Sequence, residues 1–403
     1  MGGQRRSLAV TEEAATTTEA RPPGGIESDR SRRWAATMAG HRGQGMRTAH
    51  ADSNAAVGPV PVVALDREDR QEAEDKTLAD GATRATASGR RSVAEEPDPY
   101  RTCFERDRDR ILHSSAFRRL AGKTQVFIFP ADHQRTRLTH ALEVAQVATG
   151  IARVCRLNVA LTEAIALGHD CGHGPGGHAS EDALGIFLAD GFDHAVWGAD
   201  VSVAGLNLCQ ETLDGIRNHS WSRPAPSTPE GEVVSWADRI AYVCHDWEDA
   251  VSAGIVTPAM LPEVVRKRCG ESRSHQLRAF IGGVTGATLS SGRVAMDEEL
   301  ADALASFRQN NYEHVYFRPA SVSQGTAVVA MLRDLVEHFA DQPNRIPGVA
   351  ETGGLAGGSA DAVHAAVAYV AGMTDRFAMA SAVGDLGWDA RNLPRGIEET
   401  RHG

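Results

Sequence analysis

The 403-residue sequence contains no run of 18 apolar residues, which excludes a transmembrane helix of ordinary length. Its first thirty residues lack the apolar stretch that a secretory signal requires, so we expect no such signal. The six cysteines form no CxxC pair, which argues against a zinc ribbon or a secreted disulfide scaffold. Together these absences predict a cytoplasmic protein with reduced thiols and no membrane partner.

The net charge of −11 is distributed unevenly along the chain. Residues 1–95 contain 14 basic and 14 acidic side chains, whereas the remaining 308 residues contain 28 basic and 39 acidic ones. A sequence-independent DNA-binding protein needs a basic surface to neutralise phosphates, so this acidic main part disfavours one. Any anionic ligand must therefore be bound by a local basic pocket.

The composition divides the chain into three parts. Residues 1–95 contain only 14 large apolar side chains, too few to offset the entropy of the chain, and predict a disordered leader. Residues 96–383 have the pattern of a folded domain, and residues 384–403 that of a short polar tail.

Helical periodicity dominates the folded part, and convincing strands are almost absent, so the predicted class is all-α. The expected helices cover 102–122, 137–156, 161–170, a segment from about 179, 230–252, two segments within 299–340, and 361–383. Thr162 is a plausible N-cap for 161–170, and Thr228 followed by Pro229 predicts the start of 230–252. Residues 123–130 favour a short strand or an extended arm.

Half of the 16 histidines lie between residues 133 and 245. Three predicted helices contribute His140, the pair His169-Asp170, and Asp238. These two imidazoles and two carboxylates suit one divalent transition metal ion. Any one of these residues alone is more often an ordinary core or surface residue. Their joint occurrence on three helices is what favours a metal site.

Neighbouring residues extend this pattern. A glycine-rich turn at 172–177 would let His178 fold back toward the metal ligands. Arg137 lies one helical turn before His140, which would direct a guanidinium toward a phosphate beside the metal. Tyr242 and Asp246 share one face of the 230–252 helix with Asp238, whereas we expect Asp249 to belong to a solvated acidic face.

Three segments closely resemble the HD-domain phosphohydrolases: RTRLTHALEVAQVA (135–148), HDCGHGPGGHASE (169–181) and WADRIAYVCHDWEDA (236–250). RLAGKTQVF (119–127) and AGMTDRFA (371–378) narrow the resemblance to the deoxynucleoside triphosphate triphosphohydrolases, the dGTPase-like branch. The resemblance covers about residues 100–383. It implies an all-α HD-domain core at about 135–252, with additional C-terminal helices.

The resemblance also assigns roles by position. It implies metal ligands at His140, His169, Asp170 and Asp238, and catalytic residues at His178, Glu181 and His173. It implies substrate binding by Arg137, Lys123, His194, Arg239, Tyr242 and Asp246. Two departures leave the preferred base open: Gly176 stands where relatives carry an aromatic residue, and Trp197 stands where they carry glutamine.

The reaction that the resemblance implies is hydrolysis of a dNTP, dGTP by the family name, to a deoxynucleoside and inorganic triphosphate. Water would attack the α-phosphorus with the help of one divalent ion, for which Mg²⁺, Mn²⁺ and Co²⁺ all suit the ligands. The family also suggests a homo-oligomer, such as a hexamer, and interaction with single-stranded DNA, which the charge does not support. The alternatives are an HD hydrolase of another nucleotide phosphoester and a non-catalytic nucleotide-binding sensor.

Overall fold

The computed structural model describes residues 29–395 apart from 39, 43–44 and 129–133, and it divides into two compact units, 1–64 and 65–403. In the described part of the first unit, helix α1 (Asp29–Thr37) is followed by a hairpin of β1 (His41–Arg42) and β2 (Arg47–Thr48), which pair antiparallel. The rest of the predicted leader before residue 29 lies outside the described residues. The described part of the chain contains no helix with the length and apolarity to cross a membrane.

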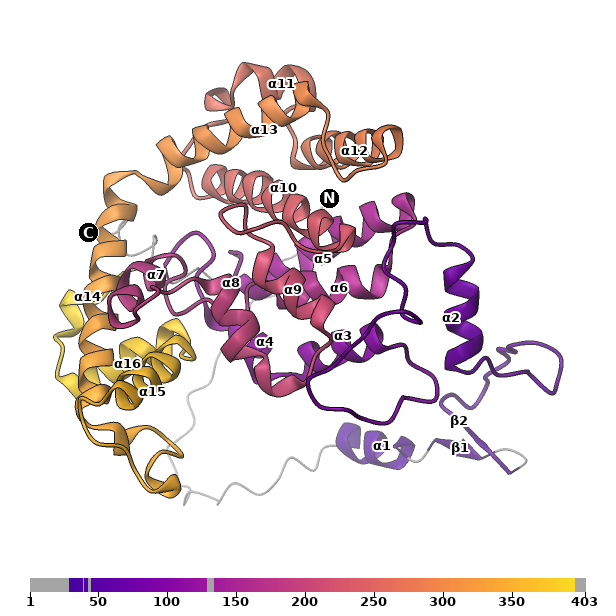
Figure 1. The fold of residues 1–403 in the computed structure, drawn as a ribbon, viewed down its shortest axis with the longest axis horizontal. Helices are drawn as coiled ribbons and strands as arrows, with labels where there is room; N and C mark the ends of the chain where they lie inside the picture. The colour runs from indigo at the N-terminus through magenta and orange to yellow at the C-terminus, as the bar shows by residue number, and fades with distance from the viewer. Residues whose placement is uncertain (1–28, 39, 43–44, 129–133, 396–403) are drawn as a thin grey trace, which may run out of the picture. The chain divides into compact units, whose positions relative to one another are not determined.

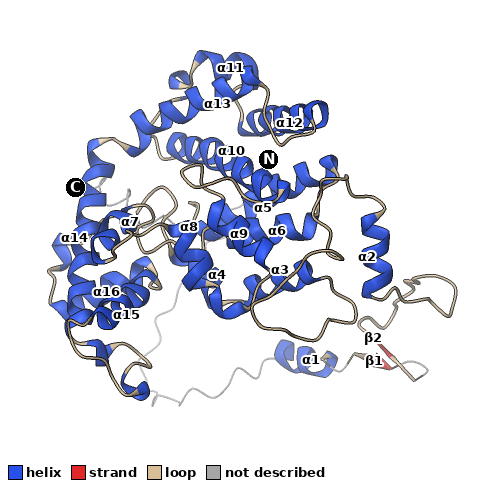
Figure 2. Ribbon diagram, viewed as in Figure 1, coloured by secondary structure: helices blue, strands red, loops and turns tan. Residues whose placement is uncertain are grey.

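The second unit is helical, which confirms the all-α prediction (Figure 2). Its α-helices are α2 (Arg67–Asp75), α3 (Cys103–His113), α4 (Ser115–Arg119), α5 (Arg137–Cys155), α6 (Val159–Gly168), α7 (Ala179–Leu184), α8 (His194–Trp197), α9 (Gln210–Asn218), α10 (Pro229–Ser252), α11 (Glu263–Cys269), α12 (Arg273–Ser291), α13 (Glu298–Asn311), α14 (Pro319–Asp341), α15 (Ala360–Ala371) and α16 (Asp375–Leu386).

Two hydrophobic clusters organise these helices, whose order along the chain Figure 1 shows by colour. In the first cluster, α5 packs against both α6 and α10, α3 packs on α6, and α11 to α13 complete the same core. In the second, α14 packs against α7, α15 and α16. The segments that carry the histidines and carboxylates of interest run from α5 to α10, and α7 and α8 of this stretch join the second cluster.

Capping residues explain where the helices begin. The Thr228 side chain accepts a hydrogen bond from the backbone of Gly231, and Pro229 occupies the first turn of α10, as expected. The proposed cap at Thr162 is wrong, because Asn158 caps α6 four residues earlier. The single helix expected over 361–383 is two helices, since Thr374 caps α16 just after α15 ends.

The predicted boundary of the leader at residue 95 is also wrong, because residues 65–95 belong to the second unit. The buried Glu230 carboxylate accepts hydrogen bonds from the backbone and hydroxyl of Thr83 and from the backbone of Asn158. Arg91 forms an ion pair of 2.6 Å with the fully buried Asp107. This segment is anchored by the buried Leu78, Ala82 and Ala85 and by polar contacts to buried carboxylates, and a count of its apolar residues does not detect the polar contacts.

Other boundaries also shift. Residues 123–128 make no regular strand and share only an isolated bridge between Thr124 and Thr136, while 129–133 lie outside the described residues. The helix expected over 102–122 divides at Ser114, which caps α4. In the proposed tail, α16 continues to Leu386, and residues 396–403 lie outside the described residues.

Candidate metal centre and active site

The four predicted metal ligands, which we call the metal cluster (His140, His169, Asp170 and Asp238), lie on α5, at the end of α6 and on α10. The ligand atoms of His140, His169 and Asp238 lie within 4.8 Å of one another, and so do those of His169, Asp170 and His219. The Nε2 atom of His140 lies 3.0 Å from Oδ1 of Asp238, and Nε2 of His169 lies 3.6 Å from the same oxygen. Nε2 of His169 is also 3.4 Å from Oδ1 of Asp170. Separations of about 3–3.5 Å are those of ligand atoms that surround one cation at about 2.1 Å.

The hydrogen bonds of His169 fit a metal ligand. Its Nδ1 lies 2.7 Å from the carbonyl oxygen of Ala166, which can only accept, so Nδ1 carries the proton. The lone pair of the buried Nε2 then faces the two carboxylates, and this atom has no hydrogen-bond partner among the described residues. A backbone bond that fixes the tautomer in this way is the usual support of a metal-bound imidazole.

The electrostatics of the metal cluster favour a positive charge at its centre. Burial opposes ionisation of Asp170, but the Arg137 guanidinium and nearby imidazoles outweigh it and hold the pKa of this carboxyl well below its ordinary range. Burial also opposes a charge on His169, yet Asp170 and Asp238 raise its pKa to about 9. A proton and a metal ion therefore compete for the same nitrogen.

Arg137 is the first residue of α5 and is almost fully buried beside this cluster. Its Nη1 donates to Oδ2 of Asp170 over 2.7 Å, while Nε and Nη2 have no partner among the described residues. Gly177 leaves space for it, since a Cβ atom there would lie 3.0 Å from Nη2. The guanidinium thus offers two free donors for an anion next to the metal ligands.

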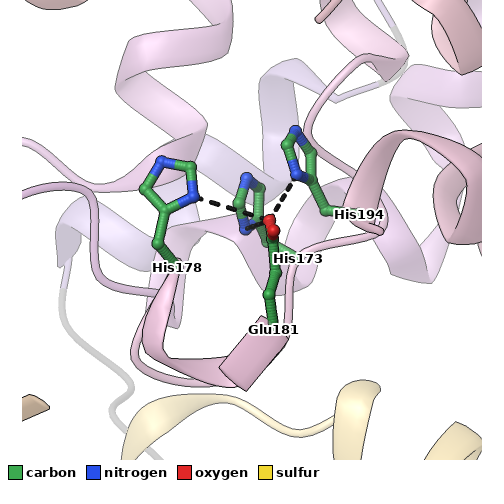
Figure 3. A group of neighbouring side chains, drawn as sticks. All are labelled: His173, His178, Glu181 and His194. Atoms are coloured by element: carbon green, nitrogen blue, oxygen red, sulfur yellow. Dashed lines mark hydrogen bonds and ion pairs between the residues drawn. The ribbon is translucent and has the colours of Figure 1, made fainter. Parts of the chain in front are cut away.

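A second group of imidazoles surrounds one carboxylate, and we call it the Glu181 cluster (His173, His178, Glu181 and His194; Figure 3). Oε1 of Glu181 lies 2.5 Å from Nδ1 of His194, 3.5 Å from Nδ1 of His178 and 3.9 Å from Nδ1 of His173. The His173 and His194 rings stack at 3.7 Å. The expected pairing of Glu181 with His178 is present, but the shorter contact is to His194.

Exposure separates the members of the Glu181 cluster. The His178 side chain is 76% exposed, whereas that of His173 is 1% exposed. Burial opposes ionisation of Glu181, but its bonds with His178 and His194 lower its pKa far below the ordinary value. An ionised carboxylate thus connects one solvent-facing imidazole to buried ones.

Sequence reasoning missed His219, which follows α9 and extends the Glu181 cluster inward. Its Nε2 lies 3.3 Å from Nε2 of His194, its Nδ1 lies 2.8 Å from the carbonyl oxygen of Ile216, and its ring packs edge-on against that of His169. It is almost fully buried. No spacing in the sequence connects residues 194 and 219, since only the tertiary fold brings α8 and the end of α9 together.

Tyr242 and Asp246, both on α10, face a row of side chains from α13 and the π-helical turn Tyr312–Tyr316 that follows it. Arg308 donates through Nε to the Tyr242 hydroxyl over 2.7 Å, and the Tyr316 hydroxyl donates to Oδ2 of Asp246 over 2.6 Å. Oδ1 of Asp246 has no partner among the described residues, and burial raises the pKa of this carboxyl to about 8. The sequence analysis missed Arg308 and Tyr316, because only the packing of α13 and the turn after it against α10 brings them to Tyr242 and Asp246.

The remaining predicted residues differ in how well they fit. The Arg239 guanidinium lies 3.6 Å from the ring centre of Trp221, and its Nε has no partner among the described residues. Lys123 is buried and donates to the carbonyl oxygens of His173 and Ala371, so it connects these two segments and has a structural role. The solvated position expected for Asp249 is wrong, because its side chain is 12% exposed and pairs with Arg135.

Gly176 fits its turn without an aromatic side chain. Its φ is +75°, and a Cβ atom there would lie 2.5 Å from Cγ1 of Val328 on α14, so a larger residue would be strained and would clash. Its backbone N–H donates to Asp375 over 2.9 Å, and the same carboxylate accepts from the backbone of Thr124. The first residue of α16 therefore holds the turn between His173 and His178.

Comparison with known proteins agrees with this geometry. Residues 137–243 match the HD domain, and residues 294–382 match the phosphohydrolase-associated domain. A deoxyguanosinetriphosphate triphosphohydrolase-like protein of Caldanaerobacter subterraneus is 40% identical over 78% of this chain and 93% of its own. A protein of the same name from Clostridium perfringens is 39% identical over 71% of this chain and 87% of its own, and one from Desulfatibacillum aliphaticivorans is 37% identical over 78% and 95%. The chain therefore belongs to the deoxyguanosinetriphosphate triphosphohydrolase-like proteins, a family of metal-dependent nucleotide phosphohydrolases with an HD domain.

Proposed function

We propose that this protein hydrolyses deoxynucleoside triphosphates to a deoxynucleoside and inorganic triphosphate. The observation that carries the proposal is the position of Arg137, which binds the metal-cluster residue Asp170 with one nitrogen and leaves two buried donors free. An anion that accepts from these donors would lie directly beside the metal cluster. A phosphate group meets both requirements.

The metal cluster would hold the divalent ion, with Mg²⁺, Mn²⁺ and Co²⁺ as candidates for its two imidazoles and two carboxylates. When bound, such an ion polarises a phosphate oxygen and offsets the charge that develops during attack on phosphorus. Arg137 would orient the α-phosphate against it. Arg239 and Arg308 supply further positive charge for the rest of the triphosphate. They lie along the side of the site that contains Tyr242 and Asp246 of α10, which we call the α10 wall.

Proton transfer falls to the Glu181 cluster. His178 is the exposed imidazole of this cluster, and the ionised Glu181 lies 3.5 Å from its Nδ1, which favours Nε2 as the atom that exchanges a proton with the reacting groups. The water loses a proton as its oxygen bonds to the α-phosphorus. The 5′-oxygen gains one as its bond to phosphorus breaks. His178 and the neighbouring His173 are placed to assist these transfers.

The α10 wall offers a site for the sugar. Asp246 and Tyr316 form a hydrogen-bonded pair with one carboxyl oxygen still free, which suits a sugar hydroxyl that must be both donor and acceptor. The names of the relatives favour dGTP among the four deoxynucleoside triphosphates. Assembly into a homo-oligomer stays a prediction from the family resemblance, and a cytoplasmic location stays a prediction from the cysteine pattern and the sequence of the first thirty residues.

The test is incubation of the purified full chain with each dNTP and Mg²⁺, Mn²⁺ or Co²⁺ in ¹⁸O-labelled water, followed by ion-exchange separation and mass spectrometry. The proposal predicts deoxynucleoside and triphosphate, with the label in the triphosphate because water attacks phosphorus. Labelled orthophosphate or pyrophosphate would instead indicate another HD phosphohydrolase. Absence of turnover of single dNTPs and of their mixtures would indicate a nucleotide-binding sensor. His178→Ala serves as the variant that should lose activity while it keeps the metal.

A further inference from the structure

Two cysteines from distant parts of the sequence meet beside one glycine. Cys103 is the first residue of α3, and Cys209 directly precedes α9. A Cβ atom on Gly89 would lie 2.5 Å from Sγ of Cys103 and 3.8 Å from Sγ of Cys209, so both sulfurs border the space that this glycine leaves open at its φ of +87°. The two thiols share a hydrogen bond and form no disulfide. Their sulfurs are therefore neighbours that a covalent bond could join.

Backbone and arginine contacts hold the two cysteines in this position. Arg91 pairs with Cys209 in an isolated antiparallel bridge, and its Nη2 donates to the carbonyl oxygen of Cys103 over 2.9 Å. The backbone N–H of Cys209 donates to the buried Asp107 carboxylate over 2.8 Å, and the same carboxylate pairs with Arg91. The fold itself thus keeps the two sulfurs adjacent.

The two thiols differ in exposure and in acidity. Cys209 is buried, whereas Cys103 is part-buried and lines a cavity of about 670 Å³ that exposed side chains such as Arg101 border. The hydrogen bond with Cys209 lowers the pKa of Cys103 below its ordinary value, and Arg91 acts in the same direction, against burial and the Asp107 carboxylate. Cys103 is therefore the thiol that a small solute reaches, and Cys209 is placed to react next.

The remaining cysteines do not share these properties. All of them lie in the described part of the chain, and all are buried: Cys155, Cys171, Cys244 and Cys269. Reactive thiols are accessible and have a lowered pKa, whereas buried structural cysteines are inert. An oxidant should therefore react first at Cys103.

We propose that Cys103 and Cys209 are an oxidation site at which a hydroperoxide converts the two thiols to a disulfide. The thiolate sulfur of Cys103 attacks one peroxide oxygen, the O–O bond breaks, and the hydroxide that leaves takes up a proton to become water. Cys103 is then a sulfenic acid. The sulfur of Cys209 attacks the sulfur of Cys103, the S–OH bond breaks, and the hydroxyl group leaves with the proton of Cys209 as a second water.

The disulfide would join the start of α3 to the residue before α9. Both helices pack on α6, which ends directly before the metal-cluster residue His169. The oxidation needs neither the metal cluster nor a nucleotide. It is therefore independent of the proposed function and can be tested whatever the protein hydrolyses.

The test is treatment of the reduced full chain with a small excess of hydrogen peroxide, followed by alkylation, digestion and mass spectrometry without reduction. We expect linked peptides that contain Cys103 and Cys209 and that dithiothreitol separates. We also expect Cys103 to lose its free thiol at least about tenfold faster than the buried Cys155. A disulfide with another cysteine, a link between two chains, or a Cys103 that stays reduced or stops at the sulfenic acid would overturn the proposal.

Serine variants separate the two steps. In Cys209→Ser, Cys103 should still react but cannot form the disulfide, so dimedone should trap its sulfenic acid. In Cys103→Ser, Cys209 should stay a free thiol, and dimedone should label neither position. Cys155→Ser, the same change outside the pair, is the matched control and should form the disulfide as the wild type does. Oxidation of Cys209 in Cys103→Ser as fast as in the wild type would show that Cys103 is not the thiol that the peroxide attacks.

Discussion

The metal cluster and the Glu181 cluster are both built from imidazoles and carboxylates and lie side by side, yet they are organised in different ways. In the metal cluster, the ligand atoms of His140, His169 and Asp238 lie close together and Asp170 lies beside His169, whose Nε2 has no hydrogen-bond partner among the described residues. In the Glu181 cluster, the contacts run in series from His178 through Glu181 and His194 to His219.

This difference decides what each cluster needs. Lone pairs and carboxylates that converge repel one another unless a cation lies between them, so the metal cluster is completed by an ion that the chain must bind. In the Glu181 cluster, the hydrogen bonds run in series, so the protons that the residues share balance the charge of the carboxylate without a metal ion. Substitutions in the first cluster should therefore remove the metal, whereas those in the second should lower the rate and leave the metal bound.

The largest effect is expected from Asp238→Asn, which removes a ligand charge from the metal cluster. We expect activity to fall on the order of 1,000-fold or more, because the ion both binds and polarises the phosphate. Elemental analysis of the purified variant should show the metal lost in parallel. Asp302→Asn, the same change at an exposed position on α13, is the control and should alter neither quantity.

A smaller loss is expected from Glu181→Gln, which keeps the shape of the side chain but removes the charge that His194 and His178 share. General acid–base assistance contributes about 100-fold or more, so we expect kcat to fall by roughly that factor. Elemental analysis should show an unchanged metal content. If the metal is lost as well, the two clusters are one unit and the contrast between them fails.

Sequence patterns pointed to His140, His169 and Asp238, which the structure brings close together, because these residues follow helix spacing and a known motif. They located α10 from Thr228 and Pro229 for the same reason, because capping is a local property. The contacts of His219 and of Tyr316 depend on which helices pack together, and no local pattern encodes that. The leader boundary failed similarly, since residues 65–95 are tied down by carboxylates such as Glu230, more than 130 residues further along the chain.

Arg137 and Arg135 provide the next test, because they lie two residues apart and have different partners. Arg137 has two free donors beside the metal cluster, whereas Arg135 pairs with Glu143, Glu248 and Asp249. We expect Arg137→Gln to lower kcat/KM about 30-fold, since it removes a contact to phosphate, and also to lower Tm, since it breaks the buried ion pair with Asp170.

Arg135→Gln should lower the stability with little effect on the kinetics. It leaves part-buried carboxylates unpaired, so Tm should fall by a few degrees (roughly 2–4 °C) while kcat/KM stays within about threefold. Steady-state kinetics and thermal unfolding of both variants measure the contrast. Equal kinetic losses would mean that Arg137 supports α5 and does not contact the substrate.

The smallest effect concerns Asp246, a buried carboxyl that, among the described residues, accepts a hydrogen bond from the Tyr316 hydroxyl and forms no ion pair. Burial raises its pKa from the ordinary 3.8 to about 8, so the folded protein holds this proton more tightly than the unfolded chain does. Between about pH 4 and pH 8 the unfolded chain releases the proton first, and the stability contributed by this group falls as the pH rises through that window.

Asp246→Asn imitates the protonated carboxyl and does not titrate. The Tm of this variant should therefore gain on that of the wild type by about 2–4 °C between pH 5 and pH 8, as measured by calorimetry. If Tm changes with pH in parallel for the variant and the wild type, the Asp246 carboxyl is ionised in the folded protein. Burial without an ion pair would then not be enough to keep a carboxyl of the α10 wall protonated.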